Sequence, residues 1–414
     1  VSIFLYLRRK NLKKEGLLFL YRTRWGIKLI NYVGEKYQKT LKTLSYFSIF
    51  LGYLLMIGII YLVGKLIWLY PQIVKQVKVP PIMPIVPYID KIVPGLPSFY
   101  FFYFIVIIAI IAIPHEFAHG IFMRRYNVRI KSTGFGFFPF FLPVFLAAFV
   151  EQDEKSLKKA SKFEQMSILS AGTFANVLTA VFFFIIMWLF FSLAFAPGGV
   201  IFDDYAYDLV NISSIIMVNG VQLQTPDYQE IIPLINSDKT FQEIKTQNQE
   251  YVGFKEISSD EKYAYLYYDS PAIKEGLENI ILKVEGKEIT NIEELSEELS
   301  KYSPDEKITL TVIGKDKELY NKDIVLGKNP ENENSWLGIG FSEYKRSGIL
   351  GKIVSFLSSF KEPHIYYKAK LDGLCSFIYN LLWWTILISV SVALINICLL
   401  YTSPSPRDLS TSRM

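Results

Sequence analysis

Four stretches of this sequence are long and apolar enough to cross the hydrocarbon core of a membrane, and they limit the possible folds more than any other feature. A spanning helix needs about 20 predominantly apolar residues. The four stretches cover residues 44–70, 99–123, 168–195 and 377–400. We therefore expect a polytopic α-helical membrane protein.

Composition and charge exclude several other classes of protein. Hydrophobic residues make up 51% of the 414 residues and charged residues only 20%, which excludes a disordered chain, collagen and a coiled coil. The net charge of +5 comes from 44 basic and 39 acidic residues that are scattered along the chain, so we expect no nucleic-acid partner. Cys375 and Cys398 are too few for a disulfide framework or a CxxC zinc or redox site.

Basic clusters predict the orientation in the membrane. Lys and Arg gather in residues 8–42, 124–131 and 155–162, and short basic loops stay on the cytoplasmic side. The N-terminus is therefore expected inside and the Pro-rich segment 71–97 outside. Everything from 197 to 371 is also expected outside, before the last span returns. This topology predicts a multi-pass protein of the cell membrane.

Residues 134–150 are apolar but interrupted by Gly and Pro. Irregular backbone at membrane depth is tolerated only inside protein or beside a water-filled cavity, so this composition favours a re-entrant or half-buried hairpin. The alternative is an apolar loop lying on the membrane interface.

Between the third and fourth spans, residues 200–341 have short alternating strands and charged loops. A short helix is expected at 270–277, then a strand with a Gly turn at 280–289, a helix at 292–299 and a strand at 307–313. This order resembles a PDZ domain, a fold that takes an extended peptide as an added strand.

Two other segments qualify the PDZ resemblance. Residues 212–223 look like a second, degenerate copy of the strand and Gly turn, and the polar segment 237–261 is interpreted as an insertion. The alternative is an ordinary small sheet domain that binds nothing, because a fold alone does not fix a function.

The second span contains His115, Glu116 and His119. Positions i and i+4 share one face of a helix, so both imidazoles can reach one metal ion, and Zn²⁺ suits them. A non-ligating carboxylate beside the metal can take a proton from water and pass it to a leaving amine. The alternative is a pair of core histidines bonded to neighbouring carbonyls. His364 lies outside any ligand spacing and is expected at the surface or interface.

The motifs together resemble the site-2 protease family of intramembrane zinc metalloproteases. The residues that carry the resemblance are 114–120, the Gly-Phe-Gly at 134–136, Ala-Phe-Val-Glu at 148–151 and Ser-Ala-Gly-Thr-Phe-Ala-Asn at 170–176. Archaeal members with a PDZ-like insertion are the most similar in pattern. The resemblance implies a protease that acts in regulated intramembrane proteolysis, with a membrane-anchored protein as its substrate.

The resemblance also implies roles for individual residues. His115 and His119 would be zinc ligands and Glu116 the catalytic base. The hairpin with Gly134 and Gly136 would pair with the unwound substrate. Asn176 ends a Gly-x-x-x-Asn element that we also place among the substrate-binding residues, although helix packing through small residues explains most of that element.

The third zinc ligand of this family is an Asp in an Asn-x-x-Pro...Asp-Gly motif of the last span, and that motif is incomplete here. Residues 391–396 approach it, but no Asp-Gly follows Asn396. Asp372 precedes the last span and is expected outside, and Asp408 is followed by Leu409. Because the peptide from about 398 resembles the translation of a sequencing adapter, we expect the natural gene to continue beyond Ile397 with the missing Asp.

These expectations divide the chain into five parts. Residues 1–42 would be a cytoplasmic basic segment and 43–196 a membrane core with the His-Glu-x-x-His helix, the hairpin and the third span. An extracytoplasmic PDZ-like region with a polar insertion would cover 197–345, and an interfacial segment with a truncated last helix 346–397. Residues 398–414 would be an adapter artefact.

Two other functions remain open from the sequence. The chain could be a membrane scaffold that tethers extracytoplasmic peptides through the PDZ-like region, with structural histidines. It could also be a small transporter with an intramembrane metal site, but no internal repeat of the spans supports that. Stoichiometric zinc would distinguish the protease from the scaffold.

Overall fold

The computed structural model describes residues 12–15, 18–23, 25–73, 83–93, 95–139, 143–224, 226–235, 241–258, 261–314, 316–342 and 348–402. They form two compact units. The helical unit comprises 1–191 and 371–414, and the sheet unit comprises 192–370. The sheet unit therefore includes the segment 346–370, which the sequence analysis grouped with the last span. The adapter-like segment 403–414, with Asp408, lies outside the described residues.

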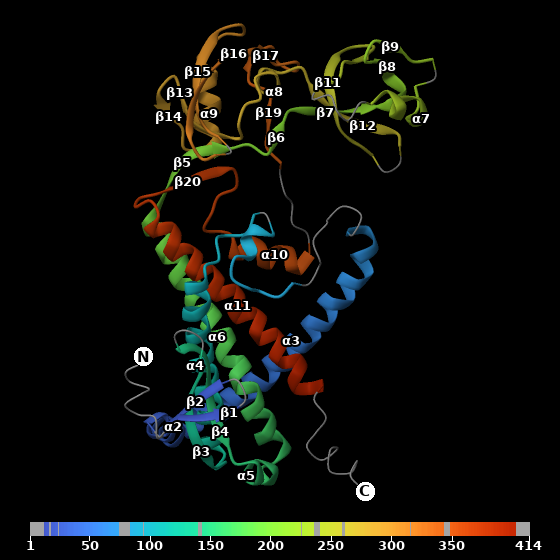
Figure 1. The fold of residues 1–414 in the computed structure, drawn as a ribbon. Helices are drawn as coiled ribbons and strands as arrows, with labels where there is room; N and C mark the ends of the chain where they lie inside the picture. The colour runs from blue at the N-terminus through green and yellow to red at the C-terminus, as the bar shows by residue number, and fades with distance from the viewer. Residues whose placement is uncertain are drawn as a thin grey trace. The chain divides into compact units, whose positions relative to one another are not determined.

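Four long helices, labelled in Figure 1, dominate the helical unit: α3 (Gln38–Ile73), α4 (Phe101–Arg125), α6 (Lys162–Ala194) and α11 (Leu374–Thr402). All four are long and apolar enough to cross a membrane, which confirms the four predicted spans. Within the most apolar window of each helix, only 11 to 28% of the residues are buried inside the protein. The remaining apolar surface therefore needs hydrocarbon around it.

Small polar side chains join three of these helices. The Ser170 hydroxyl on α6 donates to Ser48 Oγ on α3 at 3.0 Å, and Ser45 on α3 bonds the Tyr126 hydroxyl at the end of α4 at 2.7 Å. Such contacts let spanning helices approach closely where no hydrophobic effect acts between them. On α11, the ring of Trp384 stacks on Phe99 just before α4, with centroids 4.3 Å apart.

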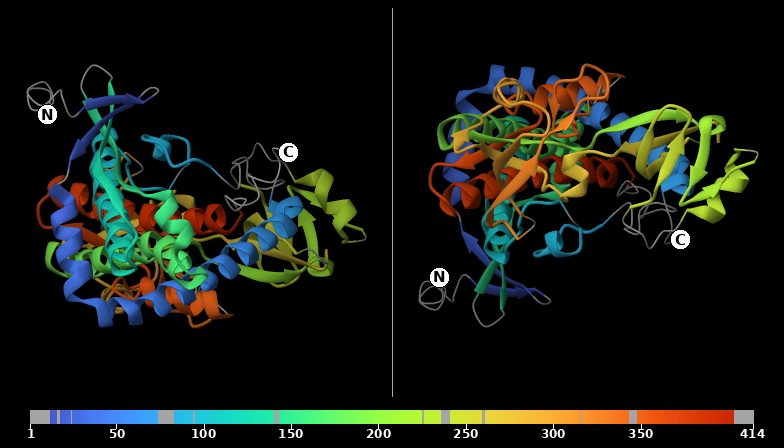
Figure 2. Two further views of the ribbon diagram at one scale, coloured as in Figure 1. Left: turned by 90° about the horizontal axis from the view of Figure 1, so that it is seen from below. Right: turned by 90° about the horizontal axis from the view of Figure 1, so that it is seen from above.

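A four-stranded antiparallel sheet lies beside the second half of α4. Its order is β1-β2-β3-β4, with β1 at Leu12–Glu15, β2 at Leu18–Thr23, β3 at Ile130–Pro139 and β4 at Pro143–Gln152. The hairpin predicted at 134–150 is thus a β-hairpin, whose tip at 140–142 lies outside the described residues. Strands β2 and β3 lie side by side in every view (Figures 1 and 2). The described residues of the unit also form two shorter α-helices, α2 (Trp25–Lys36) and α5 (Glu154–Lys159), and a 3-10 helix at Ile89–Lys91.

The N-terminal strands were not expected from the sequence. Tyr21 pairs with Phe135, and Arg22 pairs with Gly134. A Cβ added to Gly134 would lie 2.2 Å from the Tyr21 carbonyl oxygen, so glycine is required there for β2 to approach.

The described part of the sheet unit contains two larger sheets and two pairs of short strands. One sheet has the order β16-β15-β13-β5-β20, with β14 on β13, and the other has the order β7-β12-β11-β10-β8-β9. The strands of the first are β5 (Phe195–Ile201), β13 (Ile280–Val284), β14 (Lys287–Glu288), β15 (Lys307–Ile313), β16 (Leu319–Val325) and β20 (Ile365–Ala369). Those of the second are β7 (Tyr207–Asn211), β8 (Ile215–Val218), β9 (Val221–Gln222), β10 (Ile244–Thr246), β11 (Glu250–Ile257) and β12 (Tyr263–Tyr268). The short strands are β6 (Asp204–Tyr205), β17 (Gly327–Lys328), β18 (Ser335–Trp336) and β19 (Ile339–Gly340), and the helices are α7 (Tyr228–Ile231), α8 (Pro271–Lys274), α9 (Ile292–Leu299) and α10 (Gly348–Leu357).

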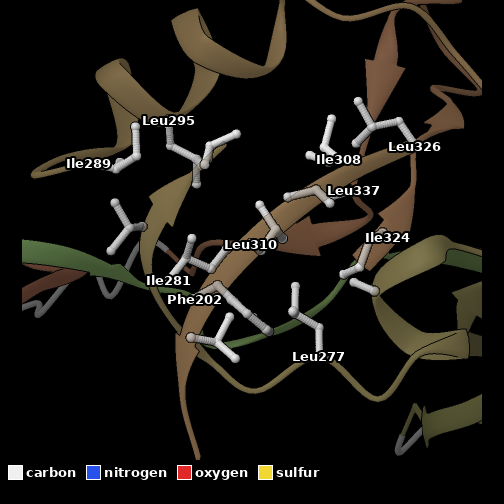
Figure 3. Close-up of a cluster of buried hydrophobic side chains, with 14 residues drawn as sticks. Phe202, Leu277, Ile281, Ile289, Leu295, Ile308, Leu310, Ile324, Leu326 and Leu337 are labelled. Carbon is white, nitrogen blue, oxygen red and sulfur yellow. The ribbon is translucent and has the colours of Figure 1, made fainter. Parts of the chain in front are cut away.

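Each of the larger sheets has its own hydrophobic core. The first core, shown in Figure 3, packs α9 and the α8 turn against β13, β15 and β16 through residues such as Ile281, Leu295 and Leu310. Helix α9 and strand β15 have the bounds that the sequence predicted, and the short helix expected at 270–277 is α8. The second core gathers around Ile215 and Leu266.

The predicted second copy of the strand and Gly turn is confirmed as a local structure. Strand β8 turns through Asn219 and Gly220 into β9, as β13 turns through Glu285 and Gly286 into β14, and all four turn residues have positive φ. The described part of the segment predicted as a polar insertion, 237–261, forms strands of the second sheet. There, β10 pairs with β8, and β11 pairs with β12 inside the sheet.

Candidate metal centre

The three predicted active-site residues lie on one turn of α4, after Pro114. His115 Nε2 and His119 Nε2 face each other at 3.2 Å, and the two rings are nearly perpendicular, with an interplanar angle of 80°. Two nitrogens that both bind a tetrahedral zinc at about 2.05 Å lie about 3.3 Å apart. The observed spacing of the two nitrogens therefore fits two ligands of one zinc ion.

A backbone carbonyl on α6 orients the second imidazole. The Ile168 oxygen accepts a hydrogen bond from His119 Nδ1 at 2.7 Å. A proton fixed on Nδ1 leaves the lone pair on Nε2, which is the tautomer that binds a metal. His119 is thus oriented as a ligand by its packing against α6.

Gly172 on α6 provides the space in front of both rings. A Cβ added to Gly172 would lie 2.4 Å from His119 Nε2 and 2.6 Å from His115 Nε2. Those distances are shorter than any non-bonded contact, so only a residue without a side chain lets α6 pack this closely against both imidazoles. Glycine at this position therefore allows the two rings to keep the orientation that suits a shared metal ion.

Glu116 contacts the hairpin instead of the imidazoles. Its Oε2 accepts a hydrogen bond of 3.0 Å from the backbone N–H of Val150 on β4. This N–H points away from β3, so it lies on the side of β4 that pairs with no other described strand, which is the free edge of the sheet. The carboxylate is therefore held between α4 and that edge.

The two hairpin glycines proposed for substrate binding lie on β3. Gly136 pairs with Leu20 on one side and with Ala147 on the other, so β3 is an interior strand. Gly134 likewise has partners in β2 and β4. Any strand added to this sheet beside the His-Glu-x-x-His turn would pair with β4, and the glycines would act by shaping the hairpin.

Asn176 lies one helical turn after Gly172 and is fully buried. Neither its amide nitrogen nor its amide oxygen has a hydrogen-bond partner, and the same is true of the buried Nδ1 of His115. Asn176 and Gly172 are four residues apart and share the face of α6 that packs against the His115 ring.

No third metal ligand joins the histidines within the described part of the chain, where no three His, Cys, Asp or Glu side chains form a metal-binding group. Asp372 is remote from them. It precedes α11, and the start of α11 lies beside the start of α4, where the Tyr103 hydroxyl donates a 2.9 Å hydrogen bond to the Phe377 carbonyl. His115 lies about 18 Å from Tyr103 along α4. His364 belongs to the sheet unit, with its Nδ1 3.6 Å from Asp203 and only 12% of its side chain exposed. It is thus more buried than the sequence analysis expected.

Sequence reasoning missed two features of this centre. Gly172 was explained by helix packing, because a small residue in a spanning helix gives the same signal in both cases. The contact from Val150 to Glu116 uses a backbone donor, which leaves no signal in residue types. The Gly-x-x-x-Asn spacing was the one signal that could have placed Gly172 opposite the histidines.

Comparison with known proteins gives two matches. The sequence model described as Peptidase family M50 matches residues 103–398, which include α4, the hairpin, α6, the sheet unit and most of α11. An uncharacterized protein of Methanocaldococcus jannaschii is 30% identical over 151 residues, which is 36% of this chain and 40% of that protein. The chain thus spans less than half the length of this relative.

Proposed function

Because the chain belongs to Peptidase family M50, a family of membrane-embedded zinc metallopeptidases, we propose that it is a site-2 type endopeptidase that cleaves membrane-anchored proteins within the bilayer. The observation that carries this proposal is the pair of imidazole nitrogens 3.2 Å apart, with both rings packed closely against Gly172. Substrates cleaved there would release regulatory fragments, as in regulated intramembrane proteolysis.

His115 and His119 would hold the zinc ion through Nε2. When bound, zinc supplies the Lewis acidity that polarises a peptide carbonyl and activates water. A catalytic zinc usually has three protein ligands, and we propose that the third is an Asp encoded after Ile397 in the natural gene. Sequencing an independent clone across that codon tests this part of the proposal; natural sequence that continues as Cys-Leu-Leu-Tyr-Thr-Ser would contradict it.

Glu116 would act as the general base. Its carboxylate takes a proton from the attacking water and then delivers that proton to the leaving amine. The 3.0 Å hydrogen bond from Val150 occupies Oε2 and holds the carboxylate at the edge of the sheet. The substrate backbone would therefore be presented beside the group that moves the proton.

The free edge of β4 would hold the substrate extended. A helix hides its amides in its own hydrogen bonds, so a spanning substrate must unwind before water can reach its peptide bond. Pairing with a strand edge satisfies the unwound backbone, as in other cases of strand addition. Gly134 and Gly136 would support this role through the shape of the hairpin, and Asn176 through α6.

The sheet unit would select substrates on the extracytoplasmic side. The short helix α8, the β13–β14 turn, α9 and β15 follow one another in the order of a PDZ domain, which supports a PDZ-like fold of the archaeal type. With the sheet unit on the extracytoplasmic side, the N-terminus would lie in the cytoplasm. The unit would act by size or by recognition of an exposed chain end.

Glu116→Gln tests the proposed function. The variant should bind zinc as the wild type does but cleave a membrane-tethered reporter about 10²–10⁴-fold more slowly, because it lacks a base. Glu154→Gln, at an exposed position at the start of α5, serves as the matched control and should cleave normally. Cleavage by Glu116→Gln at the wild-type rate would refute the mechanism.

A further inference from the structure

His115 and His119 differ in how their outer ring nitrogens are satisfied. His119 Nδ1 bonds the Ile168 carbonyl at 2.7 Å, whereas the buried His115 Nδ1 has no hydrogen-bond partner. A ligating histidine normally donates its second N–H to a carbonyl, a carboxylate or water, because that bond fixes the tautomer and the ring orientation. His115 Nδ1 therefore lacks the acceptor that would fix its tautomer.

Asn176 has the complementary deficiency. It is fully buried on α6, and neither atom of its amide has a partner. Leaving the amide of a buried side chain unpaired is unfavourable, so a buried asparagine is expected to be bonded. Gly172, one turn earlier on the same face of α6, approaches the His115 ring so closely that a Cβ there would lie 2.5 Å from its Cε1.

A small rearrangement would satisfy both groups. His115 Nε2 lies 3.2 Å from His119 Nε2 and would bind the metal together with it. Nδ1 is therefore the ring nitrogen that remains for a hydrogen bond to Asn176. The two ends of an asparagine amide differ only in which atom is oxygen, and rotation of the amide exchanges them. An Oδ1 turned toward the ring accepts the Nδ1 proton, and the lone pair of His115 then lies on Nε2.

We propose that Asn176 is the positioning residue of His115, and that its amide oxygen fixes the imidazole as the Nδ1–H tautomer for metal binding. This inference rests on the proposed function, because it assumes that His115 is a ligand. Two groups of α6, one from the backbone and one from a side chain, thus orient the two histidines of α4. Asn176 would act on the metal only through His115.

Zinc binding by the full-length protein in detergent tests the proposal, with the metal alone as the probe and a chromophoric chelator as competitor. Asn176→Leu keeps the size but loses the acceptor, and it should weaken zinc affinity about 10–100-fold. Asn176→Asp keeps an acceptor oxygen and should restore the affinity to within about threefold of the wild type. Thr179→Val is the matched control on α6, since the Thr179 hydroxyl bonds only its own helix at Ala175.

Two readouts separate positioning from mere packing. The visible spectrum of the Co²⁺-loaded protein should change in Asn176→Leu and be restored in Asn176→Asp, because it reports the ligand geometry. Wild-type zinc affinity in Asn176→Leu, or equal losses in the Leu and Asp variants, would overturn the inference alone. A wild-type protein that binds no zinc while His115→Ala behaves identically would overturn the proposed function and this inference with it.

Discussion

Gly172→Ala is the substitution that most directly tests the metal centre. The new Cβ would lie 2.4 Å from His119 Nε2 and 2.5 Å and 2.6 Å from Cε1 and Nε2 of His115. Since non-bonded carbon contacts are comfortable only from about 3.5 Å, the rings or α6 must move by about 1 Å. The imidazoles themselves are short and rigid, and Ile168 holds one of them.

The size of the effect follows from that displacement. Zinc–ligand distances vary by only about 0.2 Å between sites, so a shift of 1 Å separates the nitrogens from a shared ion. Misplacement of this size also costs about 10²-fold in catalysis. We expect zinc affinity to fall at least about 100-fold, together with an overpacking cost of about 1–3 kcal/mol.

Competition with a chromophoric chelator measures the affinity, and a membrane-tethered reporter measures cleavage. Gly58→Ala is the matched control, because Gly58 lies within a spanning helix and a Cβ there meets nothing within 4 Å. That variant should bind zinc normally. Full zinc occupancy and wild-type affinity in Gly172→Ala would show that the two histidines, in the arrangement that α6 packing gives them, are not the metal ligands.

Two further substitutions test the sheets. Gly134→Ala should displace β2 and lower the protection of the hairpin amides in hydrogen-exchange mass spectrometry, since its Cβ would lie 2.2 Å from the Tyr21 oxygen; protection as in the wild type would contradict the strand order. In the sheet unit, bonds from Lys287 at 2.5 Å and Lys301 at 2.7 Å hold the pKa of Glu298 below its usual value. The stabilisation that results is present above the unfolded-state pKa and lost as the pH falls through the lowered one, so Glu298→Gln should speed exchange in α9 at neutral pH but not in strong acid. Equal effects at both pH values would exclude the charge as the cause.

The sequence predicted the elements whose signals are local. A run of apolar residues longer than any soluble strand or helix requires identifies a span, and the i, i+4 histidines identify a shared helix face. Helix α9 was bounded correctly because residues 292–299 have helical periodicity, and in the structure Asn291 caps the helix by accepting from the Glu294 N–H.

The features that depend on distant pairing could not be predicted in the same way. Strand β2 lies in a basic segment and finds its partner β3 more than a hundred residues later, so no local pattern connects them. The polar composition of the segment 237–261 suggested an insertion. In the structure, however, Ile244 on β10 and Tyr251 on β11 are both buried in the sheet. The third zinc ligand, by contrast, was sought by motif and remains a proposal about the natural gene.

The role of β4 as a template can be separated from its role in the fold by two proline substitutions at neighbouring positions. Val150 directs its N–H to Glu116, and Ala148, which pairs with Phe135, has the same orientation, so the Ala148 N–H also points to the free edge. Ala148→Pro removes a donor that the sheet does not use, whereas Phe149→Pro removes one directed at Gly134. If a substrate pairs with this edge, Ala148→Pro should keep the fold and the zinc affinity but cleave a tethered reporter at least tenfold more slowly, while Phe149→Pro should lose the hairpin itself. Normal cleavage by a folded, zinc-loaded Ala148→Pro protein would mean that the substrate is held elsewhere, because proline cannot donate to an added strand.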